Sequence, residues 1–175
     1  MGDNPDRKIL AEGKYLRLVV EDGWEFVERK ATTGIVVIVA VTESGQLLLV
    51  EQFRPPVRGR VIELPAGLAG DVAGQEDEDL ADAARRELSE ETGYEAASMT
   101  PLGGGPPSSG TTSEVVTFFR ADGLRRTGRG GGDAHEDIEV HEVPRAEARG
   151  WLRQRERDGL LVDPKVYAGL TLAGL

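Results

Sequence analysis

Residues 85–94 read RRELSEETGY and bring three carboxylates close together. At helical spacing Glu87, Glu90 and Glu91 share one face, where like charges repel by roughly 0.2–0.5 kcal/mol per pair. The C-terminal end of a helix also carries partial negative charge and favours Lys, Arg or His. Such a cluster needs relief, by protonation of the carboxyl groups, by an arginine or by a bound cation.

The neighbouring residues bear on these three possibilities. Arg86 can hold one carboxylate, but one arginine cannot neutralise three. On a helical wheel Glu87 and Glu91 continue an apolar stripe formed by Leu80 and Ala84. If this stripe faces the protein, the two carboxylates point inward or into a cleft, where an unpaired charge is very costly. Oxygen ligands without a cysteine or a nearby histidine favour Mg²⁺ or Mn²⁺ over Zn²⁺. The alternative is a solvated acidic helix on the surface.

The elements that must position this helix are mostly strands in the first third of the chain. Short apolar segments bounded by turn-forming residues predict these strands. They cover 15–22, 24–31, 34–42, 46–53 and 60–64, with two more at 113–120 and 136–143. The block 35–41, IVVIVAV, is apolar on both faces and should lie centrally in a sheet.

Helical periodicity replaces this pattern after LPAG and runs to Gly93, a typical C-terminal cap. Two further helices are predicted over 144–159 and 163–175, each opened by a proline in its first turn. Glycine-rich stretches at 101–110 and 124–135 are predicted as loops, the second one mobile. This element order predicts an α/β protein, a mixed sheet with helices packed on it.

Composition limits the class of partner. A chain of 175 residues without internal repeats is expected to form one domain. Its 31 acidic and 21 basic side chains give a net charge of −10, which argues against a general nucleic-acid or anionic-membrane binder. The N-terminus is polar, and no apolar stretch reaches the length of a membrane span. We therefore expect a cytoplasmic protein with a small or cationic partner.

Residues 86–94 resemble the second half of the Nudix box, R-E-U-x-E-E-x-G-U, in which U is an aliphatic or aromatic residue. Seven residues separate Glu78 from Arg86, as in the box, whereas ten separate Gly67 from Glu78 where the box has five. The resemblance implies a hydrolase that splits a nucleoside diphosphate linked to another moiety. It also implies an α/β/α sandwich with a mixed sheet, as a single Nudix domain over 1–175.

Further stretches are similar to the ADP-ribose and nucleotide-sugar pyrophosphatases of this family. They are 50–67, which leads into the box, and SSGTTSE at 108–114, which resembles S-P-G-x-S-x-E with Ser109 in place of the proline. The similarity runs from about Trp24 to the C-terminus. It implies that ADP-ribose, split into AMP and ribose 5-phosphate, or a related nucleotide sugar is the substrate. Residues 1–33 would form an antiparallel strand extension that joins two copies as a homodimer.

The same resemblance assigns the metal ligands and the base. The cofactor, Mg²⁺ or Mn²⁺, would be held by the three box glutamates and one backbone carbonyl: Glu87, Glu90, Glu91 and Ala66. Arg86 would orient a glutamate without touching substrate. The general base would be Glu136 in the second glycine-rich loop, with Glu139 and then Glu90 as the next candidates.

Substrate contacts are expected from four residues. Arg54 and Arg60 flank the turn before the box and would contact phosphate oxygens; ordinary surface charge is the alternative. Glu63 would contact ribose or support a metal ligand. Trp24 would stack on a nucleobase, in the neighbouring subunit's site if the N-terminal strands swap; packing within its own sheet is the alternative.

Two classes of function follow from these residues. One is a metal-dependent diphosphate hydrolase, and the other is a Nudix-fold module that senses such a ligand without cleaving it. Sensors usually lose part of the box and often add a DNA-binding domain. Here the box arginine and its three glutamates are all present, and the chain has no room for a second domain, so the enzyme is favoured.

Overall fold

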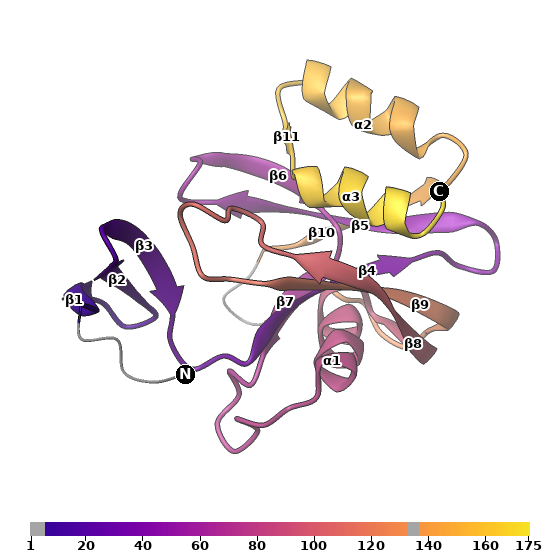
Figure 1. Cartoon of the computed structure of the whole chain (residues 1–175). Helices are drawn as coiled ribbons and strands as arrows, with labels where there is room; N and C mark the ends of the chain where they lie inside the picture. The colour runs from indigo at the N-terminus through magenta and orange to yellow at the C-terminus, as the bar shows by residue number, and fades with distance from the viewer. Residues whose placement is uncertain (1–5, 133–136) are drawn as a thin grey trace.

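The N-terminal strands form a sheet of their own, which is joined to the rest of the fold by hydrogen bonds between Val27 and residues 111–113 (Figure 1). The computed structural model describes residues 6–132 and 137–175. The N-terminal sheet is antiparallel and contains Lys8–Glu12 (β1), Leu16–Glu21 (β2) and Trp24–Arg29 (β3). The predicted strand extension is therefore confirmed, with β1 as a strand that the apolar pattern does not predict.

Two four-stranded sheets form the core, in the orders β7-β4-β9-β8 and β10-β5-β6-β11. Pairs β4–β9 and β6–β11 are parallel and the other pairs antiparallel, so both sheets are mixed. The core strands are Gly34–Ala40 (β4), Gln46–Arg54 (β5), Gly59–Glu63 (β6), Ala66–Ala69 (β7), Tyr94–Gly105 (β8), Val116–Arg126 (β9), Glu139–Pro144 (β10) and Leu161–Val162 (β11).

Helices cover the sheets on two sides, which confirms the predicted α/β/α sandwich (Figure 1). Leu80–Thr92 (α1) packs on β4, β7 and β8, while Ala148–Arg157 (α2) and Pro164–Leu172 (α3) lie on the other side. Among the described residues, no helix combines the length and apolar character needed to cross a membrane.

Strand β4 lies at the centre of the core, as its two apolar faces predict. Val37 and Val39 pack into the apolar cluster that includes α2 and α3, whereas Val36, Ile38 and Ala40 pack into the cluster beneath α1. All five side chains are fully buried. Because full burial of a Val or Ile side chain contributes roughly 1.5–3 kcal/mol, this strand anchors both layers.

Helix α1 is capped at both ends by the residues that the sequence indicates. The Asp79 carboxylate accepts a hydrogen bond from the Ala81 N–H at 2.8 Å. At the other end Gly93 adopts a left-handed conformation with φ 74°, and its N–H donates to the Ser89 carbonyl. A side chain at position 93 would meet the backbone of Gly128, with its Cβ only 2.5 Å from the carbonyl oxygen. Glycine is therefore required there twice over.

The second glycine-rich stretch, predicted as a mobile loop, begins later than expected and is hydrogen-bonded to α1 in its described part. Leu124–Arg126 still belongs to β9. The N–H groups of Gly131 and Gly132 then donate to the carbonyls of Glu91 and Glu90, at 2.8 and 3.1 Å. These carbonyls lie in the last turn of α1, which leaves them without helical partners. The described part of this stretch is thus fixed to α1 because it satisfies the end of that helix.

Two other boundaries correct the sequence expectations. Strand β8 continues through Pro101 to Gly105, where a loop was predicted, because its residues pair along the full length of β9. Pro144 ends β10 and does not open a helix; α2 begins at Ala148. Because β10 is an edge strand, the missing N–H of this proline is tolerated there. Pro164, in contrast, does stand in the first turn of α3 as predicted.

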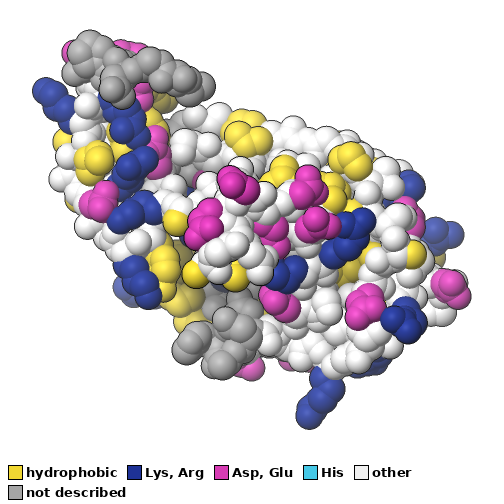
Figure 2. Space-filling view, turned by 90° about the horizontal axis from the view of Figure 1, so that it is seen from below, with side chains coloured by type: hydrophobic (Ala, Val, Ile, Leu, Met, Phe, Trp, Pro, Cys, Tyr) yellow, Lys and Arg dark blue, Asp and Glu magenta, His cyan; other side chains and the backbone are white. Residues whose placement is uncertain are grey.

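Acidic side chains gather on the face over α1. Figure 2 shows acidic side chains gathered over the helix and the loop that precedes it, and Lys and Arg side chains along the N-terminal sheet. Exposed acids in this loop and helix include Glu76, Asp77, Asp79, Asp82 and Glu90. The excess negative charge of the chain is therefore concentrated on this part of its surface.

Candidate active site

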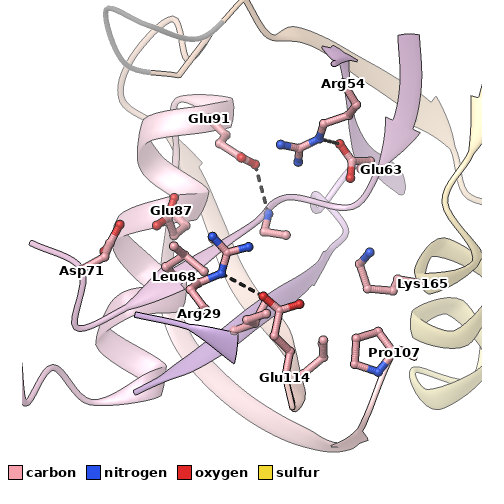
Figure 3. Close-up of a pocket in the computed structure, with 14 residues that line it drawn as sticks. Arg29, Arg54, Glu63, Leu68, Asp71, Glu87, Glu91, Pro107, Glu114 and Lys165 are labelled. Atoms are coloured by element: carbon pink, nitrogen blue, oxygen red, sulfur yellow. Dashed lines mark hydrogen bonds and ion pairs between the residues drawn. The ribbon is translucent and has the colours of Figure 1, made fainter. Parts of the chain in front are cut away.

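A pocket of about 400 Å³ lies beside α1 and is lined by residues of six strands, of α1 and α3, and of the loops that follow β7 and β8 (Figure 3). One wall is acidic and contains Asp71, Glu87 and Glu91. Basic side chains of β3, β5 and α3 line it as well, together with Glu63 and Glu114; the basic residues are Arg29, Arg54 and Lys165. A pocket with anionic and cationic walls can hold a metal ion and a phosphorylated ligand at the same time.

Glu87 reaches this pocket because residue 67 has no side chain. A Cβ at Gly67 would lie 1.9 Å from the Glu87 Cδ, far inside contact distance. The Glu87 carboxyl group is consequently held against the backbone of β7. Burial raises its pKa from 4.5 to about 7, although the neighbouring Arg86 pulls in the opposite direction. A carboxylate in this position gains from any cation that enters the pocket.

Glu91 lies one turn further along α1 and is almost fully buried, with 3% of its surface exposed. Its Oε2 accepts a hydrogen bond from the Ala66 N–H at 3.1 Å. This bond brings the main chain of β7 to the same wall as the two carboxylates. Glu87, Glu91 and Ala66, three of the four predicted metal ligands, thus line one pocket.

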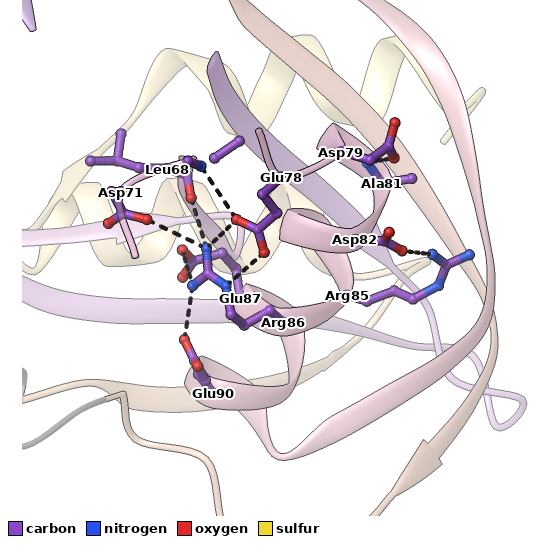
Figure 4. Close-up of polar contacts among 12 residues, drawn as sticks. Leu68, Asp71, Glu78, Asp79, Ala81, Asp82, Arg85, Arg86, Glu87 and Glu90 are labelled. Carbon is purple, nitrogen blue, oxygen red and sulfur yellow. Dashed lines mark hydrogen bonds and ion pairs between the residues drawn. The ribbon is translucent and has the colours of Figure 1, made fainter. Parts of the chain in front are cut away.

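Arg86 is the positive partner that the acidic helix requires (Figure 4). Its guanidinium donates to both Glu78 carboxylate oxygens at 3.0 Å, to Glu87 at 2.8 Å and to Glu90 at 3.2 Å, and lies 3.6 Å from Asp71. It also donates to the Leu68 carbonyl at 2.8 Å. The bond from Arg86 holds the pKa of Glu78 below its usual value. One guanidinium faces four carboxylates, so the group keeps a surplus of negative charge.

Glu90 takes a different position from the other two box glutamates. Its side chain is 50% exposed, bonds to Arg86 and does not line the pocket. Glu136, the predicted general base, lies outside the described residues. Glu139, the next candidate, is exposed on β10, with Oε2 4.0 Å from Arg60, and does not line the pocket either.

Only one of the two predicted phosphate-binding arginines faces the pocket. Arg54 and Glu63 both line it and are joined by a hydrogen bond of 2.8 Å. Strand register places Phe53 opposite Arg60 and Arg54 opposite Gly59. Since successive side chains of a strand alternate between faces, Arg54 and Arg60 point in opposite directions. Arg60 instead contacts Glu51, on the face away from the pocket.

Trp24 stands at the start of β3 and is 65% exposed. It lines a shallow hollow of about 380 Å³ together with residues of the β8–β9 loop, Ser109 and Gly110 among them. This hollow shares no lining residue with the pocket. Within one subunit Trp24 therefore does not reach the acidic wall.

Sequence reasoning missed four charged residues of the pocket: Arg29, Asp71, Glu114 and Lys165. The Arg29 Nε donates to Glu114 at 2.8 Å, and Lys165 bonds to Asp163, the N-cap of α3. Glu114 closes the SSGTTSE stretch, and Asp71 belongs to the lengthened loop before α1. Both therefore lie in segments whose resemblance to the family could have pointed to them. No sequence pattern indicated Arg29 or Lys165, because only the packing of β3 and α3 brings these two residues to the pocket.

A second group of possible metal ligands lies elsewhere. Ligand atoms of Glu51, Glu139 and His141 come within 4.8 Å of one another, and His141 Nε2 is 3.0 Å from Glu51. Hydrogen bonds from Arg60 and His141 outweigh burial and lower the pKa of Glu51. Because Arg60 already supplies positive charge here, we interpret the group as an ion-pair network.

The pocket has the donor chemistry of a hard divalent cation. Its ligand candidates are carboxylate and backbone oxygens, and Gly67 leaves the space that the Glu87 carboxylate occupies. A model of the NUDIX domain matches residues 31–161. The chain belongs to this family. The matched span contains both core sheets apart from the last residue of β11, as well as α1 and α2, whereas the N-terminal sheet precedes it.

Two of the relatives of this NUDIX protein are named as pyrophosphatases. The chain is 34% identical to an ADP-ribose pyrophosphatase of Bacillus subtilis over 158 residues, which cover 86% of this chain and 82% of that protein. It is 33% identical to a GDP-mannose pyrophosphatase of Pectobacterium atrosepticum over 135 residues, covering 72% and 67%. The fold resembles the crystal structure of an ADP compounds hydrolase, with a TM-score of 0.73, 19% identity and coverage of 97% and 90%.

Proposed function

We propose that this NUDIX protein is a divalent-metal-dependent hydrolase of nucleoside diphosphate-linked compounds, with ADP-ribose as its main substrate. One observation carries the proposal: Glu87 and Glu91 stand beside the Ala66 main chain on one wall of a pocket whose other sides carry Arg29, Arg54 and Lys165. The ADP-ribose pyrophosphatase relative, matched over most of both chains, supports the substrate. A nucleotide sugar is the second candidate, supported by the GDP-mannose relative.

The residues divide the work of diphosphate cleavage. Mg²⁺ or Mn²⁺, when bound, screens the diphosphate charge and lowers the pKa of an attacking water. Glu87, Glu91 and the Ala66 carbonyl would hold it, with Glu90 as the further predicted ligand. Arg86 keeps Glu87 in place through its bond of 2.8 Å. Arg54 and Arg29 bind phosphate oxygens, and Glu63 and Glu114 orient these two guanidinium groups.

The general base is proposed to be Glu136, as the sequence resemblance implies. Its test is independent of metal binding. A base contributes on the order of 10²–10⁴-fold, so Glu136→Gln should lower kcat by at least about 10²-fold while KM and metal affinity stay nearly unchanged. If Glu136→Gln retains near-normal kcat, the base is another carboxylate, and Glu139→Gln and Glu90→Gln are the variants to measure next.

Association into a homodimer through the N-terminal sheet is part of the proposal. Large apolar side chains are exposed on this sheet and the turn before β2: Ile9, Leu10, Tyr15, Leu16 and Trp24. The strand register places Ile9 and Trp24 on one face of this sheet and Leu16 on the other. Exposed apolar side chains on both faces support an interaction surface here. The cytoplasmic location and the absence of a nucleic-acid partner remain predictions from composition.

A panel of diphosphates tests the function. Purified protein is incubated with ADP-ribose and with GDP-mannose, with Mg²⁺ or Mn²⁺, and the monophosphate products are detected by a phosphatase-coupled release of phosphate. We expect ADP-ribose to give AMP and ribose 5-phosphate, and EDTA to stop the reaction. The Glu91→Gln variant, purified in parallel, controls for contaminating hydrolases. Calorimetric binding of ADP-ribose without any cleavage would instead identify a sensor.

A further inference from the structure

The lengthened loop before α1, residues 70–79, starts with a turn that requires glycine. Strand β7 ends at Ala69, and Gly70 follows in a left-handed conformation with φ 76°. A Cβ at this position would lie 2.7 Å from the Glu76 carbonyl oxygen. A side chain would therefore be strained both by the backbone conformation and by this close approach. Gly70 thus sets the direction in which the chain leaves β7, and the next residue is Asp71.

The rest of the loop folds back on its own start. The Gln75 N–H donates to the Val72 carbonyl at 2.9 Å, and the Glu78 N–H donates to the Gln75 carbonyl at 3.0 Å, which gives two successive turns. The Gly70 N–H donates to the Glu78 carboxylate at 3.4 Å and so joins the two ends of the loop. The extra length relative to the box is therefore built into turns that hold the first residues of the loop in place.

Asp71 lies at the acidic wall of the pocket. Its side chain lines the pocket together with Glu87 and Glu91, and Figures 3 and 4 both show it beside Glu87. Its Oδ1 lies 3.6 Å from the Arg86 guanidinium, which donates to Glu87 at 2.8 Å. A separation of 3.6 Å is too long for a hydrogen bond. The Asp71 carboxylate therefore contacts the arginine only loosely and keeps its lone pairs for another partner.

Two other carboxylates of the pocket are bound more closely to their own arginines. Glu63 accepts a hydrogen bond from Arg54, and Glu114 accepts one from Arg29, both at 2.8 Å. The Asp71 side chain is in addition 38% exposed, so that a hydrated cation can reach it. An accessible, loosely held carboxylate beside Glu87 offers the hard oxygen that Mg²⁺ and Mn²⁺ prefer.

We propose that Asp71 is a further ligand of the divalent cation in this pocket, either directly or through a water molecule bound to the cation. The inference rests on the proposed metal-dependent hydrolysis, and it adds to the metal site a residue of the lengthened loop that lies outside the motif helix. Mg²⁺ usually keeps several waters, and groups that bind such waters contribute to metal affinity. A cation held between Asp71 and Glu87 also offsets the negative charge that Arg86 leaves unbalanced.

Metal binding in the absence of substrate tests the inference. Mn²⁺ is titrated by calorimetry into wild-type and Asp71→Asn proteins that have been freed of metal with EDTA. We expect the Kd for Mn²⁺ to rise about tenfold, within the loss that removal of a supporting residue causes at metal sites. Asp77→Asn removes the same charge from an exposed position of the same loop that does not line the pocket. This matched control should change the Kd less than about twofold, because salt screens exposed charges.

Thermal melts distinguish a metal ligand from a residue that only holds the loop. In EDTA, Asp71→Asn should melt no lower than the wild type, because it removes one of four carboxylates around Arg86. The same concentration of Mn²⁺ should then raise its melting temperature less than that of the wild type. A variant that melts lower in EDTA but binds Mn²⁺ as tightly as the wild type would overturn the inference.

Hydrolysis of ADP-ribose separates this inference from the proposed function. Asp71→Asn should need about tenfold more Mn²⁺ for half of its maximal rate and approach the wild-type kcat when Mn²⁺ is saturating. If the wild type hydrolyses ADP-ribose and the variant shows the same dependence on Mn²⁺, the inference is wrong and the proposed function stands. If Mn²⁺ binding depends on Asp71 but neither ADP-ribose nor GDP-mannose is cleaved, the proposed function fails and the metal ligand stands.

Discussion

The N-terminal sheet and the central strand of the core differ in how far their large apolar side chains are buried. In the core, β4 is buried on both faces and supports two helical layers. In the N-terminal part, five large apolar side chains are between 42% and 65% exposed. The core thus forms the acidic wall within one chain, although large apolar side chains such as Phe53 and Leu172 are exposed at its edges. The N-terminal sheet keeps an apolar surface that a second copy can cover.

Charge shows the same contrast. In the N-terminal sheet basic and acidic side chains balance closely: Lys30 pairs with Glu12, and Arg7 and Arg17 both contact Glu28. In the core, Arg86 alone faces four carboxylates. Balanced pairs on a surface contribute little beyond about 1 kcal/mol. The surplus of negative charge therefore marks where a cation is required, and we expect the core to determine the chemical step and the N-terminal sheet to determine association.

The largest effect is expected from a core carboxylate. Glu91→Gln removes a charged ligand candidate of nearly the same shape, so kcat for ADP-ribose should fall about 10²–10⁴-fold, a loss in the range seen for groups that act in the transition state. Steady-state kinetics over a Mg²⁺ titration measure it. Asp82→Asn, an exposed acid on the same helix that pairs with Arg85, is the control and should change kcat little. Near-normal turnover in Glu91→Gln would show that this buried carboxylate of the core is not needed for hydrolysis.

The next effect is on stability without metal. Burial raises the pKa of Glu87 from 4.5 to about 7, so this group contributes stability that is fully present below pH 4.5 and is lost as pH rises through 7. The contribution is at most about 3 kcal/mol, at about 1.4 kcal/mol per pH unit. In EDTA, Glu87→Gln should therefore match the wild type at pH 5 and melt at a higher temperature at pH 8.

Metal provides the internal control for this comparison. Saturating Mg²⁺ should raise the melting temperature of the wild type most at pH 8, where the Glu87 carboxylate is ionised, and should raise that of Glu87→Gln less. Parallel pH curves of the two proteins in EDTA would show that the Glu87 carboxyl group is not strained in the metal-free fold.

A glycine in β7 should have a smaller but still large effect on activity. Gly67→Ala introduces a Cβ 1.9 Å from the Glu87 Cδ, so the carboxylate must leave its position. We expect kcat to fall about 10²-fold, in line with the loss caused by a misplaced catalytic group. Gly150→Ala, at an exposed position of α2 with open space around it, is the control and should stabilise the helix by up to about 1 kcal/mol. Full activity in Gly67→Ala would mean that Glu87 is free to move.

The acidic helix was predictable because its signals are local. Glu87 and Glu91 are four residues apart on one turn, and Gly93 ends the helix, so sequence spacing alone places both carboxylates on one face. The core strands were predictable for the same reason. A strand that is apolar on both faces, such as β4, can hardly lie anywhere but in the middle of a sheet that is covered on both sides.

The rest of the site depends on pairing between distant segments. Arg54 and Arg60 look equivalent in the sequence, and only the β5–β6 register shows that they point to opposite faces. Arg29 and Lys165 enter the pocket from β3 and α3, at the two ends of the chain. The glycine-rich stretch was predicted as mobile because its composition is that of a linker, whereas its amides satisfy the carbonyls at the end of α1.

The smallest effect, and the one that tests the other half of the comparison, concerns Trp24. If its exposed ring serves the neighbouring subunit's site, Trp24→Ala should raise KM for ADP-ribose about tenfold, within the worth of one stacked base, and leave kcat almost unchanged. The same variant should weaken the dimer, which light scattering across micromolar concentrations measures directly. Val57→Ser, at an exposed apolar residue in the β5–β6 turn, removes a similar kind of surface without touching the sheet and should change neither quantity.

A wild-type protein that is monomeric at these concentrations would contradict the dimer. If the Trp24→Ala protein forms a normal dimer and has a normal KM, the only role left for Trp24 is packing within its own sheet. In either case the N-terminal sheet would lose its proposed role in a neighbouring subunit's site and would keep only Arg29 in its own pocket. The predictions for Glu91, Glu87 and Gly67 would stand, because they depend only on contacts within the core.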